Sequence, residues 1–116
     1  MEKRRFTRVP YKLEAMLLLG KERLPVIIKN ISIKGVFLAV KGIFEAGQPV
    51  VLEFKGYHPE GEELVEISGA VKHLDIDGIG MKFDSMDLET FDIIKNIVSY
   101  QIGDADKILD ELYKSL

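Results

Sequence analysis

The sequence predicts a mainly β protein: a six-stranded antiparallel β-barrel followed by one or two C-terminal α-helices. Two observations support this fold class. From Tyr11 to Phe83, apolar residues come in short runs separated by residues typical of turns, without a long helical stripe. After Phe83, apolar residues recur at every third or fourth position, which is the period of an α-helix. Short strands of this number suit a small barrel, because a closed sheet leaves no unpaired edge.

Each expected strand is an apolar or alternating run that ends at a turn signal. In the fifth, Val65, Ile67 and Val71 fall on one face and polar residues on the other, so one face is buried. The expected strands are residues 12–19, 24–29, 35–40, 50–54, 64–72 and 78–83. The turn signals are Gly20-Lys21-Glu22, Gly47-Gln48-Pro49, a polar loop at 56–63 and a hairpin at Asp75-Ile76-Asp77-Gly78.

The first C-terminal helix is marked by an apolar stripe and by a residue that can cap its start. Asp87 or Ser85 is placed to accept a hydrogen bond from the first turn. Gly103 is placed to end this helix, and Asp104 to cap another. The first stripe consists of Leu88, Phe91, Ile94, Val98 and Ile102. The second helix has its own stripe, formed by Ile108, Leu109, Leu112, Tyr113 and Leu116.

The first stripe is wider than the mouth of a barrel is expected to cover, because Ile93 and Ile97 extend it. Either the second helix folds back through Gly103 and covers the remainder, or a second chain does so in a homodimer. We favour the hairpin, because the connection is short enough for antiparallel neighbours. The expected organisation is a flexible basic arm (1–11), a barrel with its helix (12–102) and an additional helix (103–116).

Length and composition fit one globular domain. The 116 residues are enough to bury a core, and 47% hydrophobic and 30% charged residues argue against disorder. The chain contains no cysteine, which excludes disulfides and thiolate chemistry and fits a reducing compartment. The sequence has no apolar run of about 18 residues and no cleavage signal, so we expect a cytoplasmic protein without membrane insertion.

Charge is distributed unevenly along the chain. Residues 1–12 carry five basic side chains and one acidic side chain, a local charge of +4 in a protein of net charge −3. Residues 84–116 carry eight acids and three lysines, a local charge of −5. The basic arm therefore either meets an anionic ligand or pairs with the acidic end of its own chain.

Catalytic and metal chemistry find little support in the sequence. His58, expected in the polar loop, and His73, at a strand end, lack the spacing of metal ligands. Asp75 and Asp77 resemble the start of a calcium loop, but apolar residues and glycines replace the oxygen ligands that should follow. We therefore expect a binding domain rather than an enzyme, with no metal or cofactor.

Two short motifs carry more information. Arg4 and Arg8 form an RxxxR element in the basic arm, and Asn30, Ser32 and Gly35 form a [D/N]xSxxG element between two apolar strands. Taken alone, the second element is explained by an ordinary turn, since these residue types suit turns. Together, in this order, on an all-β pattern with a terminal helix, the two elements resemble the PilZ domain family.

The resemblance covers nearly the whole chain. The segment Gly-Ile-Gly-Met-Lys-Phe at 78–83 is similar to the closing strand of the family, and residues 104–116 extend beyond its minimal domain. The resemblance implies a receptor that binds cyclic di-GMP without turning it over. It also implies that binding is passed to a partner protein or a homo-oligomer.

The resemblance assigns the principal clamps to the basic arm. Arg4 and Arg8 would hold the ligand, because the planar fork of arginine matches both a phosphate and the O6/N7 edge of guanine. Arg5 and Lys3 would flank them as phosphate or stacking contacts. Lysine could not replace the two clamps, because its ammonium is a point charge.

The barrel would supply the opposite wall. Asn30 would read a guanine edge, Ser32 would hydrogen-bond the ligand, and Gly35 would let the backbone bend or approach closely. Two other interpretations stay open. The chain could be a small-barrel binder of single-stranded nucleic acid, although its body is acidic and we expect no DNA partner. It could also be an adaptor of the same fold that binds no nucleotide.

Overall fold

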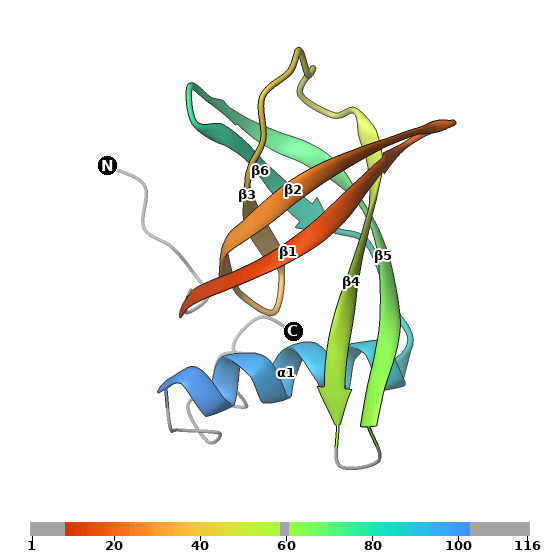
Figure 1. The fold of residues 1–116 in the computed structure, drawn as a ribbon, viewed down its shortest axis with the longest axis vertical. Coiled ribbons are helices and arrows are strands. Elements are labelled where there is room, and N and C mark those ends of the chain that lie inside the picture. Colours follow the sequence, from red (N-terminus) through yellow and green to blue (C-terminus); the bar gives the residue numbers. More distant parts are fainter. Residues whose placement is uncertain (1–8, 59–60, 103–116) are drawn as a thin grey trace.

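The computed structural model describes residues 9–58 and 61–102. Six antiparallel strands form a closed barrel in the order β1-β2-β3-β6-β5-β4, and a helix follows (Figure 1). The predicted six-stranded barrel with a C-terminal helix is therefore confirmed. The elements are β1 (Val9–Leu19), β2 (Glu22–Ile31), β3 (Gly35–Ala39), β4 (Pro49–His58), β5 (Gly61–Asp75), β6 (Gly78–Phe83) and α1 (Leu88–Ile102).

Two tight hairpins lie where the sequence predicts them. Leu19 pairs with Glu22 across a two-residue turn, in which Gly20 adopts a φ of 62°, as the first position of such a turn requires. Asp75 pairs with Gly78 across the second turn. There the backbone N–H of Asp77 donates to Asp75 Oδ1 at 3.2 Å, so the aspartate holds its own turn.

The prediction of a polar loop at 56–63 is wrong, because β4 and β5 extend into this segment. Gly56 pairs with Glu63, and the ladder runs on to the pair His58 and Gly61. The extended hairpin runs past α1 (Figure 1). A Cβ on Gly56 would lie 2.9 Å from Cγ2 of Ile93, so the missing side chain lets the helix pack closely on β4. Tertiary packing of this kind overrides the polar composition of the segment.

Apolar side chains fill the interior of the barrel and the space beneath α1. In β5, Val65, Ile67 and Val71 are buried while Glu66 is exposed, which confirms the predicted alternation. The buried residues come from all six strands, the connections and the helix. They are Leu17, Val26, Ile28, Ile31, Ile33, Val36, Leu38, Phe44, Val50, Leu52, Phe54, Val65, Ile67, Val71, Ile79, Met81, Phe83, Ile93, Ile94 and Val98.

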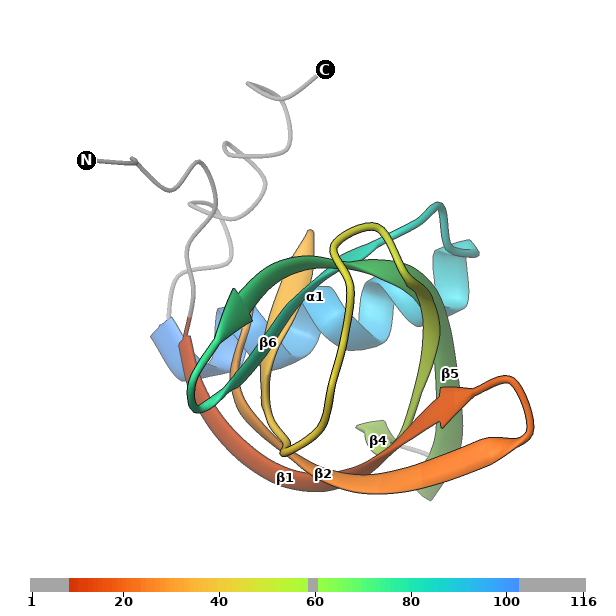
Figure 2. The ribbon, with the colours of Figure 1, turned by 90° about the horizontal axis from the view of Figure 1, so that it is seen from above.

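Helix α1 lies across one end of the barrel (Figures 1 and 2). Ile93, Ile94 and Val98 are buried there, and Ile97 packs against the same core. Gly56 of β4 lies beside Ile93, so the β4–β5 hairpin contributes to the cover of this residue. Cover of the rest of the stripe by the second helix or by a second chain stays a prediction. Leu88 also departs from the expected buried stripe, because its side chain is 75% exposed.

The predicted second helix and most of the basic arm lie outside the described residues. Strand β1 begins at Val9, three residues before the expected start of the first strand. No helix in the described ranges is long and apolar enough to cross a bilayer.

Asp87 is the residue that caps α1. Its Oδ1 accepts the backbone N–H of Thr90 at 2.7 Å, and its carbonyl oxygen accepts the N–H of Phe91 at 3.0 Å. The hydrogen bonds from the backbone and then the hydroxyl of Thr90 hold the pKa of Asp87 below its usual value. Because the pKa is lowered in the folded state, the stabilisation is present above the usual carboxyl pKa and lost as pH falls through the lowered value.

We expect Asp87→Ala to lower the melting temperature at neutral pH, and this deficit to shrink as the solution is acidified below the lowered pKa. Thermal unfolding of both proteins across an acidic pH series measures it. Asp92→Ala is the matched control, since Asp92 lies beyond the first turn and pairs with Lys95 at 3.6 Å. An equal deficit for the control, or one that does not change with pH, would contradict capping by Asp87.

Candidate ligand-binding site

The motif on the barrel occupies the turn between β2 and β3. Asn30 lies near the end of β2 and is half-buried, Ser32 is buried in the turn, and Gly35 begins β3. The four predicted arm residues fall outside the described part of the chain. They are Lys3, Arg4, Arg5 and Arg8.

The Ser32 hydroxyl holds the turn together. It accepts the backbone N–H groups of Lys34 and Gly35, each at 3.2 Å, and donates to the carbonyl oxygen of Gly35 at 3.3 Å. The N–H of Ser32 donates to the same carbonyl at 2.8 Å. One donated and two accepted bonds use the full capacity of a hydroxyl. Contact of Ser32 with a ligand stays a prediction, and it requires one of these bonds to be exchanged.

Gly35 ties the turn to β6. It pairs with Lys82, and a Cβ at this position would overlap the carbonyl oxygen of Met81. The N–H of Phe83 donates to the carbonyl oxygen of Lys34 at 2.8 Å and extends this attachment. The absence of a side chain at Gly35 therefore allows β3 and β6 to approach closely, while a role of Gly35 toward a ligand stays a prediction.

Asn30 lies beside an irregularity in the sheet. The register of β2 with β3 shifts between Ile28 and Asn30, and that of β1 with β2 shifts between Pro10 and Leu13. Bulges of this kind turn a side chain away from its regular direction and bend the strand. The half-buried Asn30 is therefore held by irregular backbone on both neighbouring strands.

The register of β1 brings the start of the described chain to the motif turn. Val9 pairs with Ile31, and Pro10 pairs with Asn30. Arg8 directly precedes Val9 in the sequence. The RxxxR element therefore ends one residue before a strand position that lies beside the [D/N]xSxxG element.

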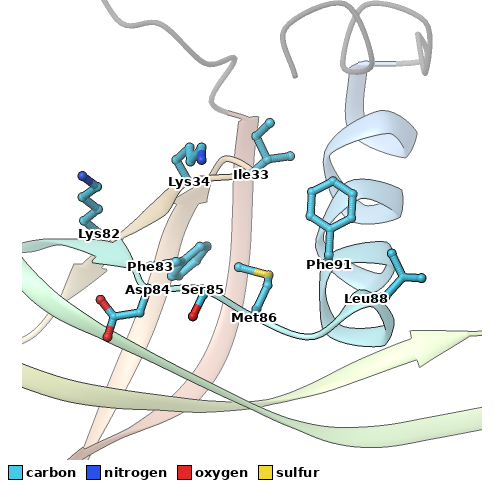
Figure 3. A pocket seen from close by; sticks show the side chains of 9 residues that line it. All are labelled: Ile33, Lys34, Lys82, Phe83, Asp84, Ser85, Met86, Leu88 and Phe91. Carbon is cyan, nitrogen blue, oxygen red and sulfur yellow. The ribbon is translucent and has the colours of Figure 1, made fainter. Parts of the chain in front are cut away.

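An open pocket of about 670 Å³ adjoins the motif turn (Figure 3). Four parts of the chain line it: the turn, the end of β6, the connection from β6 to α1, and the start of α1. The lining residues are Ile33, Lys34, Lys82, Phe83, Asp84, Ser85, Met86, Leu88 and Phe91. The sequence predicts none of them as site residues, although Lys34 lies inside the second motif and Lys82 and Phe83 lie in the segment 78–83 that is similar to a closing strand.

The pocket combines an apolar floor with charged edges. Phe83 is buried, and Met86 and Phe91 are half-buried, while Lys34, Lys82 and Asp84 are exposed. Within the described ranges, no three His, Asp or Glu side chains are close enough together to hold a metal ion. The groups present suit an organic anion with apolar faces.

Fold and site together define a class: a small closed barrel with a helix across one end and a hydrogen-bonded motif turn at its rim. Within this class, the chain belongs to the PilZ domain family, whose family model matches residues 2–100. The resemblance seen in the two sequence motifs is thereby confirmed.

Several solved structures share the fold. The PilZ domain of YcgR from Escherichia coli, solved with c-di-GMP, is 11% identical with a TM-score of 0.68, and the match covers 94% of this chain and 98% of that one. The K. pneumonia MrkH–c-di-GMP complex is 21% identical with a TM-score of 0.66, covering 92% and 56%. The Bacillus subtilis inhibitor of motility MotI/DgrA is 13% identical with a TM-score of 0.73, covering 89% and 53%.

The chain thus spans about half the length of the MrkH and MotI/DgrA chains. At these identities the likeness shows the fold alone. Among curated proteins, no match to this sequence was found.

We expect Ser32→Ala to destabilise the fold by about 1–3 kcal/mol, because it leaves two N–H groups of a buried turn without their acceptor. Thermal or chemical unfolding measures the change. Ser68→Ala on the exposed face of β5 is the matched control and should be near neutral. If both variants unfold like the wild type, the hydroxyl does not hold the turn.

Proposed function

We propose that this chain is a receptor domain for cyclic di-GMP, which binds the nucleotide without converting it and passes binding to a partner or to a second copy. Family membership supports this proposal. The YcgR and MrkH structures that share the fold contain c-di-GMP. Since cyclic di-GMP is an intracellular messenger, the proposal also places the domain in the cytoplasm.

The observation that carries the proposal is the register of β1 and β2. Val9 pairs with Ile31, which lies between Asn30 and Ser32. Arg8 is bonded to Val9 and therefore directly precedes a residue at the motif turn. Arg4 lies five positions before Val9, a separation that an extended chain spans in at most about 18 Å. Both arginines are therefore within reach of a ligand seated on the turn.

The chemistry of the two motifs matches the two parts of the nucleotide. An arginine donates two parallel N–H bonds to a phosphate or to the O6/N7 edge of guanine. Asn30, half-buried at the end of β2, offers an amide that can pair with the edge of the other base. The turn supplies a rigid wall, because Ser32 and Gly35 fix it to the barrel.

The charge distribution supports an anionic ligand. Residues 1–12 carry +4 while the whole protein carries −3, so the attraction of the whole protein for polyanions is weak and the attraction of this segment for an anion is strong. This balance favours a small ligand with two phosphates over long nucleic acids, which are held by extended basic surfaces.

We expect cyclic di-GMP to bind with a dissociation constant in the micromolar range or below, about −8 kcal/mol or better. Arg4→Ala and Arg8→Ala should each reduce binding by at least ~1.5 kcal/mol, the order of a charge-assisted hydrogen bond. Arg4→Lys and Arg8→Lys should also bind more weakly, since lysine keeps the charge and loses the fork. Titration calorimetry on the full chain measures all of these.

Arg5→Ala is the matched control and should lose less. GMP and a short oligonucleotide should bind far more weakly than the cyclic dinucleotide. No heat and no spectral change at high ligand concentration, with the protein shown to be folded, would refute the proposed function. A dominant loss in Arg5→Ala would refute the assignment of the two clamps.

Asn30→Asp tests how the barrel wall reads guanine. A carboxylate can accept from both N1–H and the exocyclic amine of guanine, whereas an amide has one acceptor oxygen. We therefore expect Asn30→Asp to bind as tightly as the wild type or more tightly, and Asn30→Ala to bind more weakly. A large loss in Asn30→Asp would mean that Asn30 faces a phosphate or a carbonyl group instead.

A further inference from the structure

The pocket between the motif turn, β6, the β6–α1 connection and α1 shares Ile33 and Lys34 with the [D/N]xSxxG element, and its other lining residues belong to neither motif. We propose that this pocket seats one guanine base of cyclic di-GMP, with Lys34 and Lys82 at its rim beside the phosphates. This inference rests on the proposed function and adds a ligand subsite formed by residues of the closing strand and α1.

The pocket is continuous with the motif turn. Ile33 and Lys34 belong to the turn and also line the pocket, and Lys82 pairs with Gly35 across the β3–β6 ladder. A ligand resting on the turn therefore lies beside this pocket. Two bases project from one cyclic backbone, so a ligand held by the arm and Asn30 at one base still has a second base to place.

The floor of the pocket suits the face of a purine. Phe83 ends β6 and Met86 lies on the connection, with Phe91 on α1 across from them (Figure 3). Aromatic rings and a thioether make favourable contacts with a planar base. Leu88 also lines the pocket, and its 75% exposure leaves apolar surface that the barrel does not cover. A stacked base would remove that surface from water.

The edge of the pocket suits guanine. Asp84 and Ser85 line the pocket on the connection. The Asp84 backbone is fixed, since its N–H donates to the carbonyl oxygen of Ser68 at 2.9 Å. Guanine presents N1–H and an exocyclic amine on one edge, and a carboxylate accepts from both. Adenine lacks the N1–H donor, so the carboxylate favours guanine.

The rim carries the complementary charge. The exposed Lys34 and Lys82 stand on the turn and on β6, at the side of the pocket away from α1 (Figure 3). If a base lies on the floor of the pocket, the phosphates of the nucleotide lie near this rim. The volume of about 670 Å³ is also within the range of roughly 300–1,000 Å³ that is usual for small-molecule sites.

Methionine methyl NMR on the full chain tests the inference directly. With 13C-methyl labels, the Met86 signal should shift when cyclic di-GMP is added, because a base would lie over it. Met16 on β1 is the internal control and should shift less, since it pairs with Pro25 and Glu53, away from the pocket. If cyclic di-GMP binds and the Met86 signal does not move, the inference is wrong while the proposed function stands.

Calorimetry with three variants gives the second test. Lys82→Ala, Asp84→Asn and Leu88→Ala should each weaken cyclic di-GMP at least about threefold, the scale of exposed polar and apolar contacts. Asp84→Asn should also narrow the preference for cyclic di-GMP over cyclic di-AMP. The matched controls are Lys21→Ala in the β1–β2 turn and Leu74→Ala on β5, which should bind like the wild type.

Unchanged binding in all three variants would overturn the subsite. The subsite would also be overturned if the Met86 signal does not shift with the nucleotide but shifts with protein concentration. That result would identify the pocket as a contact between copies of the chain. Failure of the wild type to bind cyclic di-GMP at all would instead reject the proposed function, and the subsite with it.

Discussion

The close approach of β3 to β6 at Gly35 is the constraint on which the rest of the site depends. A side chain there would overlap the carbonyl oxygen of Met81, so the barrel closes at this point only because none is present. The same contact holds the start of β3 and with it the Ser32 turn, whose hydroxyl bonds three backbone groups. The same contact at Gly35 therefore determines both the closure of the sheet and the shape of the candidate site.

The position of α1 follows from the same closure. Strand β6 ends at Phe83, and the N–H of Asp84 is already bonded to Ser68, so only a short connection separates the barrel from Asp87. Asp87 then caps the helix, and Gly56 lets its buried side pack against the β4–β5 hairpin. The pocket beside the motif turn is the space that remains where the connection crosses from strand to helix.

Most of the fold could be predicted from the sequence, because strands, tight hairpins and the helix cap are set by local patterns. The failures share a cause. The continuation of the β4–β5 ladder beyond Gly56 and the exposure of Leu88 depend on tertiary packing between elements. The local sequence pattern does not determine that packing. For the candidate site, the motifs predict Asn30, Ser32 and Gly35, but the pocket combines the motif turn with residues 82–91, which come much later in the chain. The bonds of Ser32 to the turn itself agree with the ordinary turn chemistry that the sequence left open.

The turn between β2 and β3 also bears on how sequences of this fold can diverge. Its shape is fixed by backbone groups, by the hydroxyl of Ser32 and by the absence of a side chain at Gly35. Ile33 is buried in the core, whereas Lys34 is exposed at the edge of the pocket. The Lys34 position can therefore change in evolution without rebuilding the loop, and each change alters the chemistry of the adjoining pocket. In such an arrangement the loop structure can be kept while the ligand specificity of the pocket changes.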